Sequence, residues 1–159
     1  MEHFWKESPE RISGSITQWV PIASIQSPTA SDITPVLQLG LAANGFWVLQ
    51  TGDDVVEYRP GVDCLYLLPL LEHPEASVKK ALKEGLRERG LDDSFLLNFP
   101  FEAVVEKGLL CLNHWALFAL TWCEGLVLSQ KLLVALAEAE KRGVTQEVRH
   151  KSRRLIGRR

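Results

Sequence analysis

Three pairs of acidic residues stand close enough along the chain to do acid–base or metal chemistry. They are Asp53 with Asp54, Asp92 with Asp93, and Glu102 with Glu106. Two carboxylates that share a site can serve as general acid and general base. Surface solvation, and the favourable place of acids at helix starts, explain such pairs more simply. Because no nucleophile, phosphate-loop or dinucleotide motif accompanies them, we expect no catalytic residues and no enzyme.

Cysteine and histidine offer the next candidate chemistry. Cys111, His114 and Cys123 are expected on one helix, where the first two could share a face and Cys123 points about a third of a turn away. Zinc would need further ligands of the usual kind, and the other histidines form no set with ligand spacing. Three cysteines without a CxxC pair also argue against a disulfide framework. We therefore expect buried thiols in a reducing cytosol, with no metal and no cofactor.

The net charge of −2 is unevenly distributed along the chain. Residues 141–159 contain eight basic residues and one acid, a net charge of +7, whereas residues 1–140 contain ten basic and nineteen acidic residues, a net charge of −9. Such asymmetry bears on partners rather than on fold.

The basic terminus has three interpretations. It could neutralise phosphates of a nucleic acid, it could form a terminal helix docked through its apolar positions, or its charge could pair with the acidic body. The docked helix would use Val148, Leu155 and Ile156. A free arm would not need an apolar face, so the pattern favours a docked helix over a nucleic-acid-binding arm.

The first half of the chain is the harder to assign to elements. Four prolines interrupt residues 1–35, which we expect to be irregular. Asp32 could cap a helix over residues 33–45, with Gly45 just past its end. Residues 46–59 have the pattern of a small β-hairpin around a Gly-Asp turn, although helical segments with a loop at 51–54 are the alternative. A short apolar helix should then run through Leu71, limited by Pro69.

Residues 74–159 read as a succession of helices. Val78, Leu82 and Leu86 repeat at a spacing of four residues, and Gly90 ends that helix. A helix from Pro100, an apolar central helix over 109–125, a helix over 129–143 and a last one from Thr145 follow. Trp115 and Trp122 on the central helix are expected in the core. The pattern predicts a single, mainly α domain over residues 1–159, with antiparallel helix pairs in a HEAT-like stack.

The longest apolar stretch, Leu109–Cys123, is too short to span a bilayer comfortably and contains Asn113 and His114. The opening residues lack the apolar run of a secretory signal. These features predict a soluble cytoplasmic protein with no membrane partner.

The C-terminal run resembles the ending of small bacterial proteins encoded beside polymorphic or contact-dependent toxins. Those proteins carry a W-x-x-x-A-L-x-W-x-E-G helix, then a second helix and a Q-x-x-R-H-x-x-x-R-L close. The matching residues here are Trp115, Ala119, Leu120, Trp122, Glu124, Gly125, Gln146, Arg149, His150, Arg154 and Leu155. The resemblance covers roughly the last 45 residues and carries over no catalytic residue.

This resemblance implies a helical, HEAT-like immunity protein that binds and blocks a cognate toxin with a basic surface. An acidic inhibitor can present carboxylates where the phosphates of a nuclease substrate would sit, and complementary charge speeds association. The partner-binding residues we expect are exposed carboxylates: Asp53, Asp54, Glu57, Glu72, Glu75, Asp92 and Asp93. The alternative is a nucleic-acid-associated regulator that uses the basic helix, through Arg149, Lys151, Arg153, Arg154, Arg158 and Arg159.

Overall fold

The computed structural model describes residues 6–12, 15–26, 36–111 and 113–158. The chain divides into two compact units. The sheet unit comprises Met1–Asp63 and Ala76–Pro100, and the helical unit comprises Cys64–Glu75 and Phe101–Arg159. Each unit is described by itself, and the assignment of the chain to a single domain stays a prediction.

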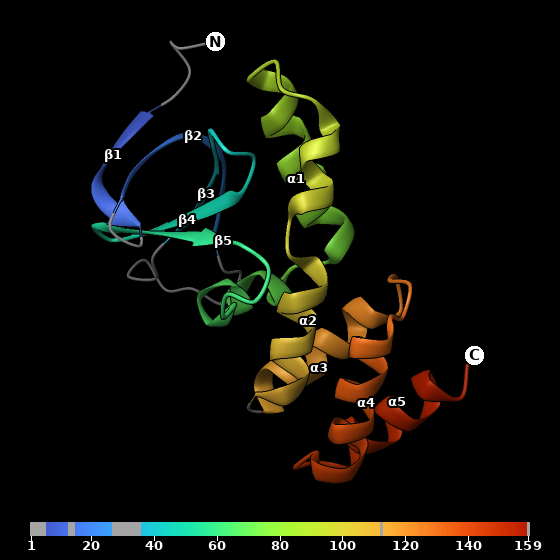
Figure 1. Ribbon diagram of the computed structural model, residues 1–159. Helices are drawn as coiled ribbons and strands as arrows, with labels where there is room; N and C mark the ends of the chain where they lie inside the picture. The colour runs from blue at the N-terminus through green and yellow to red at the C-terminus, as the bar shows by residue number, and fades with distance from the viewer. Residues whose placement is uncertain (1–5, 13–14, 27–35, 112, 159) are drawn as a thin grey trace. The chain divides into compact units, whose positions relative to one another are not determined.

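Among the described residues of the first unit, five antiparallel strands form a sheet (Figure 1). They follow one another in sheet order: β1 (Lys6–Ile12), β2 (Ser15–Ile25), β3 (Leu37–Ala42), β4 (Trp47–Thr51) and β5 (Asp54–Tyr58). β1 also lies against β5, so the sheet curls back on itself. The prediction of a mainly α fold is therefore wrong: the protein mixes helices with an antiparallel sheet.

The prediction that residues 1–35 are irregular is also wrong where the structure describes them, because β1 and β2 occupy much of this segment. Proline is tolerated in a sheet at bulges and edges. The β1–β2 register shifts between Glu7 and Arg11, around Pro9, and the β2–β3 register shifts between Pro21 and Ala23. Pro9 and Pro21 thus lie at irregularities of real strands, whereas Pro28 and Pro35 lie outside the described residues.

The helix expected over residues 33–45 is replaced by β3, and its expected cap, Asp32, lies outside the described residues. Tertiary packing explains the difference. A Cβ at Gly40 would lie 2.7 Å from the carbonyl oxygen of Val20 and 2.8 Å from Cζ3 of Trp19, so the indole of Trp19 lies directly over this glycine. The contact needs an extended strand paired with β2, which the spacing of apolar residues along 37–42 could not show.

The hairpin expected at residues 46–59 is present as β4 and β5. Thr51 pairs with Asp54, which leaves Gly52 and Asp53 as a two-residue turn. Gly52 has a φ of +59°, the left-handed conformation that such hairpin turns require.

Both faces of this sheet carry buried side chains. One face carries a cluster of Trp19, Ala42, Val48 and Val55. On the other face, Trp47 donates a hydrogen bond of 2.8 Å from Nε1 to the carbonyl oxygen of Phe95 and meets the ring of Phe99 edge-on at 5.3 Å. Phe95 belongs to the 3-10 helix η3 (Asp93–Asn98).

Helix α1 (Glu75–Glu88) buries Val78, Leu82 and Leu86, which confirms the predicted apolar face. Gly90 follows it with a φ of +67° and ends the helix as expected.

The part of the helical unit that the structure describes contains the 3-10 helix η2 (Leu65–Glu72) and four α-helices. These are α2 (Phe101–Leu110), α3 (Asn113–Cys123), α4 (Gln130–Arg142) and α5 (Gln146–Ile156). Within the unit, α2 packs on α3 and α4, and α5 packs on α4 and α3 (Figure 1). The predicted caps are present: Ser129 accepts from Leu132 N, and Thr145 accepts from Val148 N, both at 3.2 Å.

Two features of the predicted helical stack are wrong. The central helix over 109–125 is interrupted, because α2 ends at Leu110 and α3 begins at Asn113. The stack also does not extend from residue 74 to the end of the chain, because residues 76–100 group with the sheet. The apolar face of α1 can pack on a sheet as well as on another helix. The periodicity of its apolar residues therefore could not predict which of the two it contacts.

We expect Gly85→Ala to destabilise the sheet unit. Alanine normally stabilises a helix interior by up to about 1 kcal/mol relative to glycine. At this position a Cβ would meet the main-chain carbonyl group of Ile22 on β2, with the carbonyl carbon only 2.8 Å away. Overpacking of this kind costs about 1–3 kcal/mol. Urea unfolding would measure the loss, with Glu84→Ala on the exposed side of α1 as the control; an unchanged or raised stability of Gly85→Ala would contradict the close packing.

Candidate functional site

The tip of the β4–β5 hairpin carries the most accessible acidic pair. Asp53 occupies the turn, Asp54 begins β5, and both are exposed. Within the described ranges neither carboxylate has a recorded ion pair or side-chain hydrogen bond. The sheet unit that carries them contains twelve acidic and eight basic residues, a net charge of −4. The two charges are therefore available to a partner.

Glu57 does not match the expectation of an exposed carboxylate. Its residue is only 6% exposed, and Oε1 accepts hydrogen bonds from Asn44 Nδ2, at 3.1 Å, and from Arg59 Nε. The Arg59 guanidinium lies over the ring of Phe46 at 5.4 Å. A buried carboxylate needs such partners to offset its lost hydration. Glu57 thus ties the end of β5 to the β3–β4 turn.

Asp92 and Asp93 already have local functions. Asp92 is the cap of η3 and accepts a hydrogen bond of 2.7 Å from Ser94 N. Hydrogen bonding with Ser94 lowers the pKa of the Asp92 carboxyl. Asp93 Oδ2 is 2.8 Å from Arg87 Nη2 and 3.6 Å from Lys83 Nζ. The charge of Asp93 is largely neutralised by α1, whereas Asp92 stays exposed.

Glu72 and Glu75 belong to the helical unit, not to the unit of the other five expected residues. The Glu72 side chain is 6% exposed, and its Oε1 lies 3.3 Å from His114 Nε2. The Glu75 carboxylate packs beside Gly125, where a Cβ would lie 2.6 Å from Oε2. Of the seven carboxylates, the structure brings Asp53 and Asp54 together as an exposed pair and leaves Glu57 and Glu72 with little exposure.

The cysteine–histidine set is not on one helix, since Cys111 precedes α3. In the part of the chain that the structure describes, no group of three or more His, Cys, Asp or Glu side chains is placed to hold a metal ion. Burial, and secondarily the charge of Glu124, raises the pKa of the Cys123 thiol to about 12. The thiolate is the nucleophilic form of cysteine, so Cys123 is inert at neutral pH.

The basic C-terminal segment forms the docked helix that its apolar positions predicted. Val148, Ser152 and Leu155 of α5 are buried. Much of the basic charge pairs with acids of the same unit: Arg153–Glu140 at 2.7 Å, Lys151–Glu147 at 2.8 Å, Arg142–Glu138 at 3.3 Å and Arg154–Glu124 at 3.8 Å. The pairs with Glu124, Glu138 and Glu140 are also what the third interpretation, charge pairing with the acidic body, expected.

The residues that carry the family resemblance hold α3 against its neighbours. Trp122 is buried and donates a hydrogen bond of 2.8 Å from Nε1 to the carbonyl oxygen of His73. Ala119, Leu120 and Leu155 are buried, and Glu124, the residue after α3, pairs with Arg154 of α5. Trp115 is only half-buried. The shared pattern is therefore mainly a packing pattern.

Comparisons of the chain with protein-family models, curated proteins and solved structures give no match. The resemblance to immunity proteins accordingly stays a prediction. No helix in the described ranges is long and apolar enough to cross a membrane.

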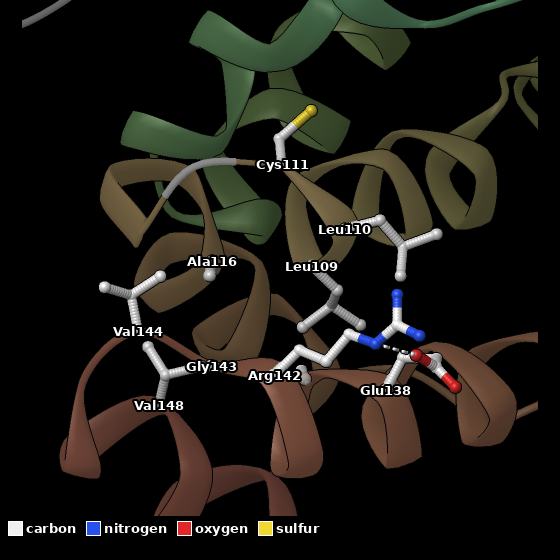
Figure 2. A pocket seen from close by; sticks show the side chains of 10 residues that line it. Leu109, Leu110, Cys111, Ala116, Glu138, Arg142, Gly143, Val144 and Val148 are labelled. Atoms are coloured by element: carbon white, nitrogen blue, oxygen red, sulfur yellow. Dashed lines mark ion pairs between the residues drawn. The ribbon is translucent and has the colours of Figure 1, made fainter.

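The sequence reasoning missed a hollow on the helical unit. It has a volume of about 150 Å³ and is lined by Leu109, Leu110, Cys111, Ala116, Glu138, Ala139, Arg142, Gly143, Val144 and Val148 (Figure 2). These residues come from four helices and the links between them, so no local pattern marks the site. The one local sign is Val144, an apolar residue in the short link between Gly143 and Thr145.

We expect the raised pKa of Cys123 to lower stability in alkali. The unfolded thiol ionises near pH 8.5–9, whereas the folded thiol stays protonated to about pH 12. Above pH 9 the unfolded state therefore binds fewer protons than the folded state, and the free energy of unfolding falls as pH rises. Between pH 8 and pH 10 the native chain should lose about 1–2 kcal/mol more than Cys123→Ala. Urea unfolding of both proteins at the two pH values measures this difference, and parallel losses would contradict it.

Proposed function

We propose that this protein acts by stoichiometric binding of another protein in the bacterial cytoplasm, as an immunity protein that neutralises a cognate toxin. The observation that carries the proposal is the exposed acidic pair, Asp53 and Asp54, at the tip of a hairpin. The tight two-residue turn and the β4–β5 pairing hold both carboxylates in one place. A preformed charge pair of this kind binds without a large cost of ordering a loop.

Electrostatics supports a basic partner. Toxins that cleave nucleic acids have basic clefts, and a negative surface steers encounter with such a cleft and competes for its cations. Fast association suits an inhibitor that protects the cell making the toxin. The acidic residues most available for this function are Asp53, Asp54 and Asp92, because Asp93 and Glu57 are already paired.

The helical unit supports the proposal in a different way. Its packing uses Trp122, Glu124 and Arg154, which are among the residues that resemble toxin-associated proteins. We infer that these residues maintain the frame and that the choice of partner depends on other surfaces.

The alternative, a nucleic-acid-associated regulator, has less support from the geometry. α5 buries its apolar face, and Arg153, Arg154 and Lys151 lie within ion-pair distance of glutamates in the same unit. To bind phosphates, these residues would have to give up their ion pairs with the glutamates. Binding of a protein through Asp53 and Asp54 does not require an existing ion pair to break.

We expect the double variant Asp53→Asn/Asp54→Asn to associate about ten-fold more slowly with the toxin encoded beside its gene, because steering charge is removed. The effect should shrink as salt rises from 50 to 500 mM. Biolayer interferometry gives the association rate, and co-expression of toxin and variant gives the loss of protection.

The matched control is Glu84→Gln/Glu88→Gln, which removes the same charge from exposed positions of α1 in the same unit. Its association rate should change by no more than about two-fold. Absence of binding between the native chain and the adjacent toxin would refute the immunity function itself. If both double variants slowed association equally, the hairpin would not be part of the interface with the toxin.

A further inference from the structure

We draw no further inference here: the strongest candidate, the surface patch of η3 around the 87% exposed Leu97, carries none, because the charges beside it on Asp93 and α1 pair with each other and nothing in the structure shows what covers the patch.

Discussion

Each unit of this protein depends on a buried indole that donates a hydrogen bond to a main-chain carbonyl far away in sequence. In the sheet unit Trp47 reaches Phe95, and in the helical unit Trp122 reaches His73, in both cases at 2.8 Å. The large ring fills the core while its polar N–H is paired with a main-chain carbonyl group. These two contacts fasten η3 to the sheet and the end of η2 to α3. Trp47 and Trp122 thus contribute to the packed cores of the two units.

Paired charge separates the structural acids from those that a partner can use. Glu57 supports the β3–β4 turn, and Asp93 pairs with α1. Glu124, just after α3, and two glutamates of α4 balance arginines of α4 and α5. Asp53 and Asp54 at the hairpin tip are exposed and outside these pairs. The strong contrast between an acidic body and a basic terminus is therefore partly neutralised within the helical unit, and the effective binding charges are local.

Much of the second half of the chain could be predicted because its signals are local. Caps at Ser129 and Thr145, the glycine at position 90 and the apolar spacing of α1 and α5 each depend on residues within one or two turns. The hairpin at 46–59 was predictable for the same reason, since a two-residue turn is a short-range signal. The first strands were not. Pro9 and Pro21 argued against regular structure, and only pairing with neighbouring strands accommodates them as bulges. The exposed pair at 53–54 was found from sequence, but the burial of Glu57 was not, because Asn44 meets it only when β5 pairs with β4.

The sequence by itself determined the helices with strong caps and apolar stripes, the β4–β5 turn, the docked C-terminal helix and the overall charge of each segment. All of these follow from interactions between residues close together in the chain. Only the tertiary structure decided that α1 packs on strands rather than on helices, that Glu57 and Glu72 have little exposure, and that four helices leave a small hollow. Those outcomes depend on contacts between residues that are distant in sequence, and an apolar stripe or an acidic residue has the same appearance in the sequence whichever partner it finally meets.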